Sequence, residues 1–118
     1  MARIFSLRRK STLALRQRKE RLLHLIKLGP DSIRASFVER YSVCGKRQCS
    51  CRHGGAKHGP FYYLTQCLAV GQINKFLLKT SAQQQAAKES IEHYRHFQEL
   101  LEELSQINTE LLRREVPL

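Results

Sequence analysis

Three cysteines and a histidine stand close together in the first half of the chain. Cys44, Cys49 and Cys51 fall within eight positions, and His58 follows the last of them after six intervening residues. Three thiolates and one imidazole suit the closed tetrahedral coordination of a structural zinc ion. The spacing is not one of the common zinc-finger patterns, so free reduced cysteines in a surface loop, or a redox role, remain the alternatives. We predict one Zn²⁺ ion bound by these four side chains.

Other residues compete for the places in this ligand set. His53 is the competing fourth ligand, and His58 is preferred because the Gly-Pro pair after it would fix the exit of the loop into a strand. Cys67 falls in the middle of a predicted strand, where a free cysteine behaves as a small buried apolar residue. His93 and His96 stand three apart on a predicted helix and are expected to be surface residues rather than ligands.

A catalytic zinc ion needs an open coordination position and usually a base nearby. Four protein ligands would close this site. The sequence also has no Asp or Glu between Glu39 and Glu89, so a local carboxylate base is absent. We therefore expect a structural site and no enzymatic activity of the zinc-hydrolase or deaminase type.

The segments on either side of the cluster have the pattern of β-strands. Residues 36–43 alternate in character and are rich in aromatic and β-branched side chains, which favours a strand. Residues 61–69 predict a second strand, and Gly71 predicts a turn into a third strand over residues 72–79. Apolar residues lie on both faces of the second strand, so both faces are expected to be covered. The metal loop would then connect two strands of a small antiparallel sheet.

Helices are predicted at both ends of the chain. Residues 11–28 carry leucines at helical spacing, and Gly29-Pro30 would end that helix. Residues 82–114 contain no glycine or proline and predict one long helix, which Thr80 or Ser81 can cap. The predicted fold class is α+β, with three segments: a basic N-terminal helix (residues 1–30), a zinc-knuckle β domain with a three-stranded antiparallel sheet (31–80) and a long C-terminal helix (81–118).

The long helix carries a pattern that is typical of a coiled coil. Six residues follow a spacing of three and four, with Asn108 at a position where a buried polar residue often fixes two strands in register. This pattern predicts a homodimer through residues 94–111. The alternative is an amphipathic helix that packs on the chain's own sheet and first helix. The six positions are Tyr94, Phe97, Leu101, Leu104, Asn108 and Leu111.

The charge of the chain indicates a polyanionic partner. The sequence has 21 Lys and Arg against 10 Asp and Glu, a formal net charge of +11. Residues 1–28 carry +8 and residues 29–80 carry +6, whereas residues 81–118 carry −3. Net charge of this size concerns partners and solubility rather than fold. It favours DNA, RNA or an anionic membrane surface.

Nucleic acid is the polyanion that the sequence favours. Basic residues contact phosphates, and aromatic rings near them can stack on unpaired bases. The basic residues around the cysteines would also offset the −1 charge of a zinc ion with three thiolates. We predict nucleic-acid contacts from the first helix, from the cysteine loop and from one tyrosine: Arg8, Arg9, Lys10, Arg16, Arg18, Lys19, Lys46, Arg47, Arg52, Lys57 and Tyr62.

Several segments between residues 36 and 114 also carry a family resemblance. They read Glu39-Arg40-Tyr41, Cys44-Gly45-Lys46, Cys49-Ser50-Cys51, His58-Gly59-Pro60-Phe61-Tyr62-Tyr63 and Tyr94-Arg95-His96-Phe97-Gln98-Glu99-Leu100. These segments resemble a family of short bacterial and archaeal zinc-knuckle proteins described as a domain of unknown function. The resemblance implies a zinc-stabilised strand, knuckle, hairpin and long helix, and a context near mobile-element genes. That context slightly favours DNA over RNA.

The same sequence allows a different class of function. The acidic long helix could dock a partner enzyme, with the zinc ion only stabilising a small fold and the basic segment meeting an acidic partner. No apolar run approaches the roughly 18 residues of a membrane span, and no apolar stretch of secretory type follows the basic N-terminus. We expect a cytoplasmic protein without a membrane partner.

Overall fold

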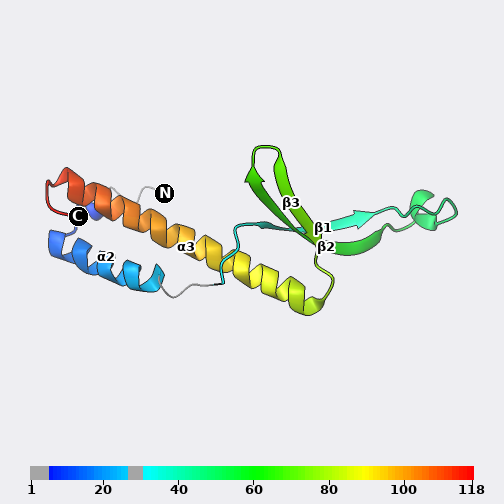
Figure 1. Ribbon diagram of the computed structural model, residues 1–118, viewed down its shortest axis with the longest axis horizontal. Coiled ribbons are helices and arrows are strands. Elements are labelled where there is room, and N and C mark those ends of the chain that lie inside the picture. Colours follow the sequence, from blue (N-terminus) through cyan, green and yellow to red (C-terminus); the bar gives the residue numbers. More distant parts are fainter. Residues whose placement is uncertain (1–5, 27–30) are drawn as a thin grey trace. The chain divides into compact units, whose positions relative to one another are not determined.

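The computed structural model describes residues 6–26 and 31–118. It confirms the predicted α+β fold, with an N-terminal helix, a three-stranded antiparallel sheet and a long C-terminal helix (Figure 1). The predicted end of the first helix, at Gly29-Pro30, lies outside the described residues. The elements are α2 (Thr12–Ile26), β1 (Ser36–Ser42), the short 3-10 turn η1 (Ser50–Arg52), β2 (His58–Ala69), β3 (Gln72–Leu77) and α3 (Ser81–Arg113).

The chain divides into two compact units. Unit 1 comprises Met1–Ser32 and Glu92–Leu118, and unit 2 comprises Ile33–Ile91. The predicted N-terminal helix and most of the long C-terminal helix therefore belong to one unit. The predicted β domain forms the other unit together with the first turns of α3. Among the described residues, no helix is both long enough and apolar enough to cross a membrane.

Unit 1 is built on two antiparallel helices, α2 and the later part of α3 (Figure 1). Ser11 caps the start of α2, because its hydroxyl accepts a hydrogen bond from the backbone N–H of Ala14 at 3.1 Å. Leu15 and Leu22 lie two turns apart on one face and are both fully buried. The buried core of this unit consists of Leu7, Leu15, Leu22, Leu100, Ile107 and Leu111.

The structure gives α3 a helical partner within its own chain. Phe97, Leu104 and Leu111, three of the six predicted seam residues, pack in the core shared with α2. Leu101 instead has 52% of its surface exposed. It lines a groove with Leu104 and Asn108. The intrachain packing that the sequence left as the alternative therefore accounts for half of the seam.

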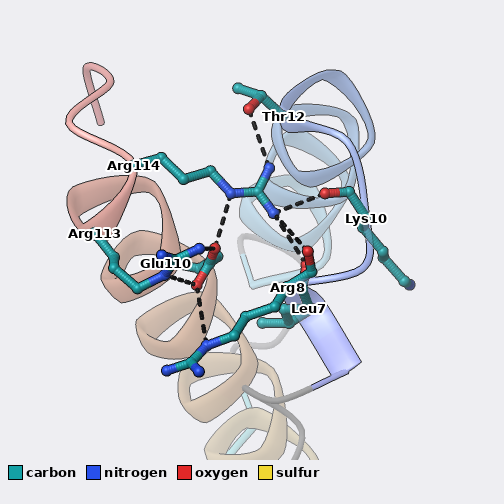
Figure 2. Close-up of polar contacts among 7 residues, drawn as sticks. All are labelled: Leu7, Arg8, Lys10, Thr12, Glu110, Arg113 and Arg114. Carbon is teal, nitrogen blue, oxygen red and sulfur yellow. Dashed lines mark hydrogen bonds and ion pairs between the residues drawn. The ribbon is translucent and has the colours of Figure 1, made fainter.

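A buried carboxylate ties the end of α3 to the segment before α2 (Figure 2). Glu110 is only 1% exposed and accepts hydrogen bonds from Arg113 at 2.9 and 2.8 Å and from Arg114 at 2.8 Å. Arg8 adds an ion pair at 3.9 Å. The guanidinium groups of Arg113 and Arg114 lower the pKa of Glu110 to about 2. This carboxylate is therefore ionised at neutral pH although it is buried.

Arg114 uses its remaining donors on the start of α2 and the residues just before it. Its guanidinium donates hydrogen bonds to the carbonyl oxygens of Leu7 (3.2 Å) and Lys10 (2.7 Å) and to the hydroxyl of Thr12 (3.1 Å). One planar side chain thus satisfies acceptors at the start of α2 and a carboxylate on α3 (Figure 2). These hydrogen bonds connect the C-terminal end of α3 to the start of α2.

Unit 2 is a sheet of order β1-β2-β3 with the first turns of α3 against one face. Thr80 caps α3, as its hydroxyl accepts a hydrogen bond from Gln83 N–H at 3.0 Å. The buried core consists of Leu64 on β2, Leu78 just after β3 and Ala87 on α3. The partly buried residues around it are Ile33, Ala35, Phe37 and Tyr62.

The expectation that both faces of β2 are covered is wrong. Phe61 is 37% and Ile73 67% exposed on the face opposite Leu64. Cys67 is also exposed rather than buried as predicted, and its thiol faces the carbonyl oxygen of Ala69. The physical reason is that a three-stranded sheet with a single helix segment has apolar material for only one of its faces.

Candidate metal centre

The register of the sheet brings the two ends of the cysteine loop together. β1 and β2 are antiparallel neighbours, and Ser42 pairs with His58 at the end of their ladder. Cys44 lies two residues beyond Ser42, so it emerges close to His58. A bulge between Arg40 and Ser42 interrupts the ladder here. Gly59 lies in it with a φ of +137°, and a Cβ at this position would meet the carbonyl oxygen of Arg40 at 2.8 Å.

A tight turn carries the other two cysteines back toward these strand ends. The η1 turn follows Cys49 and contains Cys51 (Figure 1). The N–H of Arg52 donates to the carbonyl oxygen of Cys49 at 3.1 Å, and the N–H of Cys49 donates to that of Lys46 at 3.3 Å. The Arg52 side chain donates to the carbonyl oxygen of Cys44 at 2.8 Å. These bonds fold the loop over itself, as a shared ligand site requires.

The four predicted ligands meet at one point. The ligand atoms of Cys44, Cys49, Cys51 and His58 all lie within 4.8 Å of one another. The sulfurs of Cys44 and Cys51 are 3.7 Å apart, and the sulfur of Cys49 is 3.2 Å from Nε2 of His58. Sulfurs bound to zinc at about 2.3 Å would lie about 3.8 Å apart along a tetrahedral edge. The cluster can therefore hold a metal ion.

The cysteines of the cluster are thiols rather than a disulfide. The backbone N–H of Cys44 donates to the sulfur of Cys51 at 3.4 Å. The pKa of Cys49 is lowered to about 6, first by the backbone N–H of Cys51 and then by the side chains of Cys51, His58 and Cys44. The pKa of Cys51 is raised: the backbone N–H of Cys44 lowers it, but burial and the neighbouring thiols outweigh that effect. A thiolate is thus available at neutral pH.

The competing ligands lie elsewhere. Nε2 of His53 is 2.9 Å from the carbonyl oxygen of Arg47 and does not join the cluster. Cys67 is exposed in β2. His93 and His96 are exposed on α3. Within residues 6–26 and 31–118, no second group of three or more Cys, His, Asp or Glu converges in this way.

Gly55 permits the close approach that shapes this loop. Its N–H donates to the carbonyl oxygen of Ser50 at 2.7 Å, and a Cβ here would lie 2.5 Å from that oxygen. We expect Gly55→Ala to displace η1, and with it Cys51, and to weaken zinc affinity by roughly tenfold or more. Competition with a zinc-sensitive chelating dye measures this affinity.

Gly45→Ala is the matched control. A Cβ at Gly45 would meet nothing within 4 Å, so this variant should keep the wild-type affinity. Equal affinities for the two variants would show that the close approach at Gly55 does not position the ligands.

The basic residues of the cysteine loop are exposed. Lys46, Arg47 and Lys57 all face solvent. Among the described residues, every ion pair lies in unit 1, so none of these three is neutralised by a carboxylate. Arg52 is also exposed, but its Nε is used to hold the loop through Cys44.

Several predicted contacts of the first helix are used inside unit 1. Arg18 donates to both carboxylate oxygens of Glu103, at 2.5 and 3.0 Å. Arg16 donates to the carbonyl oxygen of Pro117, and Lys19 to that of Leu118. Arg8 pairs with Glu110. Arg9 and Lys10 are exposed.

Unit 2 therefore carries more of the net positive charge than unit 1. The sequence of this unit has nine Lys and Arg against two acids, a net charge of +7. Unit 1 has twelve against eight, a net charge of +4. The acidic helix α3 offsets the basic helix α2 within unit 1. The loop and the sheet of unit 2 have no comparable acidic element.

The two neighbouring tyrosines of β2 are both half-buried but lie on opposite faces of the sheet. Tyr62 packs against Phe37 in the partly buried shell of the core, with ring centroids 5.2 Å apart. Tyr63 lies on the opposite face of β2, where Nζ of Lys75 stands 4.6 Å from its ring centroid. The sequence prediction had included neither Lys75 nor Arg40 as candidate contacts. The alternation of side chains along β2 and the pairing of the strands would have identified these residues, once it was known which face of the sheet the core covers.

A comparison with protein families finds a match for the first half of the chain. Residues 10–67 match the family described as "Domain of unknown function (DUF6788)". The matched segment contains α2, β1, all four cluster residues and most of β2. It thus includes the basic helix that the resemblance had left out, and it ends before β3 and α3. No curated protein and no solved structure gives a significant match. Over residues 10–67 this chain is similar to a family of uncharacterised domains.

Proposed function

We propose that this protein binds nucleic acid through unit 2, and that a structural zinc ion holds the loop that presents its basic residues. The observation that carries the proposal is the net charge of +7 on unit 2, with exposed Lys46, Arg47 and Lys57 around a closed ligand set. Phosphate groups are the natural partner of such a surface, because binding releases the counterions condensed on the nucleic acid.

Zinc is the metal that best fits the ligands. Soft thiolates with one imidazole in a tetrahedral arrangement favour zinc over the hard cations, which prefer oxygen. Cys44, Cys49, Cys51 and His58 would hold the ion and leave no position for substrate. The proposed role of the metal is therefore to fix the loop between β1 and β2, and we propose no enzymatic activity.

The kind of nucleic acid is a further part of the proposal. Phosphate contacts place a protein on a nucleic acid without reading its sequence. The family resemblance slightly favours DNA over RNA, with a role as an accessory factor of a mobile element in the cytoplasm. Sequencing of nucleic acid that co-purifies with the full chain distinguishes DNA from RNA.

Removing the positive charges of the cysteine loop should weaken nucleic-acid binding and make that binding less sensitive to salt. We expect the triple variant Lys46→Gln, Arg47→Gln, Lys57→Gln to bind a labelled oligonucleotide at least about tenfold more weakly. The slope of log K against log salt concentration should fall by roughly 0.7–0.9 for each phosphate group that the variant no longer neutralises. Fluorescence anisotropy over a salt series measures both quantities. Arg52 is left in place because it supports the loop.

Arg95→Gln is the control for a general effect of charge. Arg95 is exposed on α3 in unit 1, beside Glu92. This variant should bind like the wild type. If the triple variant bound as tightly as the wild type, with the same salt slope, the cysteine loop would be excluded as the contact surface.

A second function is supported by a groove on α3. Leu101 and Leu112 are 52% and 67% exposed and line it together with Leu104, Asn108 and Leu118. The groove has a volume of about 390 Å³. The alternative proposal is that α3 forms a homodimer here or docks a partner enzyme. The mass of Asn108→Leu by light scattering tests the dimer, because a leucine would change the state that a buried asparagine specifies.

A further inference from the structure

One face of the sheet in unit 2 is not used by the core. Residues opposite one another in an antiparallel pair share a face, and side chains alternate along each strand. Tyr63 of β2 pairs with Val38 and Leu77, and Phe61 pairs with Arg40. Thr65, which lies two residues beyond Tyr63 on β2, pairs with Lys75. We call the following set the open face: Val38, Arg40, Phe61, Tyr63, Ile73 and Lys75.

The core of unit 2 lies on the opposite face of the sheet. The open face is therefore the face that the core does not cover. Leu64 alternates with Tyr63 and is 4% exposed, in contact with Leu78 and Ala87. On the open face, Ile73 is 67% exposed, and Arg40 and Lys75 are also exposed. The open face therefore presents aromatic rings together with cations and is not covered by α3.

The composition of the open face suits a polyanion with flat, apolar groups. Arg40 and Lys75 lie on the two outer strands, on either side of Phe61 and Tyr63 on the central strand. The Lys75 ammonium already stands over the Tyr63 ring at 4.6 Å, so this ring has a cation beside it. Aromatic rings between basic residues on a sheet are the arrangement that binds unpaired bases by stacking and phosphates by charge.

The spacing of the rings favours a single strand over a duplex. Residues two apart on a strand are about 7 Å apart. Neighbouring bases within a duplex are stacked about 3.4 Å apart, with their flat faces covered. A duplex therefore cannot offer base faces to Phe61 and Tyr63, whereas an unstacked strand can place one base on each ring. Arg40 pairs with Phe61 at the end of β1 that leads into the cysteine loop, so the basic loop can continue the track for the phosphates.

We infer that the open face binds single-stranded nucleic acid, with bases stacked on Phe61 and Tyr63 and phosphates held by Arg40, Lys75 and the basic loop. This inference rests on the proposed function and names the class of nucleic acid and its contact surface. It assigns a role to an apolar face that the fold leaves exposed, and it moves the stacking role from Tyr62 to Tyr63.

The test compares single and double strands on the zinc-loaded full chain. Labelled poly-dT and poly-U strands and a DNA duplex of the same length are titrated by fluorescence anisotropy. We expect the single strands to bind more tightly than the duplex. Phe61→Leu and Tyr63→Leu should each weaken single-strand binding by at least about fivefold, since stacking is worth roughly 1–3 kcal/mol per base. Lys75→Gln is a third variant that keeps both rings.

Phe76→Leu is the matched control. Phe76 is 43% exposed, but it pairs with Leu64 on the covered side of the sheet. This variant should bind like the wild type, and unchanged zinc content and circular dichroism verify the fold of each variant. Wild-type affinity in Phe61→Leu, Tyr63→Leu and Lys75→Gln would overturn the inference while nucleic-acid binding itself stood. Equal affinity of the wild type for duplex and single strand would also overturn it. Absence of binding to any of the probes would overturn both this inference and the proposed function.

Discussion

Cys49→Ser is expected to release the metal ion and to disorder the loop between β1 and β2. A serine hydroxyl does not replace a thiolate, and the remaining three ligands leave the tetrahedron open. In small sites of this kind the energy of metal binding is part of the energy of folding. We expect zinc affinity to fall by more than about 100-fold and the thermal transition of unit 2 to move to lower temperature. Metal analysis of the purified chain and a melting curve measure the two effects.

Cys67→Ser provides the matched control for this substitution. Cys67 is a free thiol on the exposed side of β2, outside the cluster. Its replacement should leave both the zinc content and the melting curve unchanged. A chelator added to the wild type should reproduce the Cys49→Ser melting curve. If Cys49→Ser kept one zinc ion per chain and melted like the wild type, Cys49 would not be a ligand.

Glu110→Gln is expected to produce the largest loss of stability of any acid substitution in unit 1. The amide cannot carry the charge that pairs with Arg113 and Arg114. Arg114, whose side chain is only 17% exposed, would then lack its carboxylate partner. Breaking a buried charge pair from one side is strongly destabilising. We expect the melting temperature of the helical unit to fall by roughly 10 °C. Circular dichroism during thermal unfolding measures it.

The effect of Glu110→Gln should depend on pH in a defined direction. The folded-state pKa of Glu110 is about 2, whereas an unfolded glutamate titrates near about 4.3. A lowered pKa stabilises the fold fully above about pH 4.3, and this stabilisation is lost as the pH falls through about 2. The gap in stability between the wild type and Glu110→Gln should therefore be constant near neutral pH and almost close at about pH 2.

Glu92→Gln separates this result from ordinary surface electrostatics. Glu92 forms an ion pair with Arg95 at 3.6 Å, with side chains that are 71% and 67% exposed. Exposed pairs of this kind contribute little to stability, so this variant should melt close to the wild type at every pH. A Glu110→Gln variant that behaved in the same way would show that the cluster in Figure 2 does not hold the helices together.

Local residue chemistry was sufficient to predict the elements and the four residues that converge in the candidate metal centre. Strand alternation, the turn at Gly71 and the uninterrupted run after Thr80 each depend on near neighbours, and the observed elements confirm them within a few residues. The convergence of the four side chains was also predictable, because Cys44 and His58 flank a loop that connects two neighbouring antiparallel strands.

What only the tertiary structure decided is which surfaces face each other. The sequence presents α2 as a basic helix and α3 as an acidic helix with a coiled-coil pattern, and it left their packing on one another as the alternative to a homodimer. That packing buries Leu15 and Leu22, pairs Arg18 with Glu103 and removes part of the basic surface from solution. In the same way, α3 covers only the Leu64 face of the sheet and leaves Tyr63 outside. Residue type and spacing determine what a segment can form, whereas its partners depend on contacts between residues far apart in the chain.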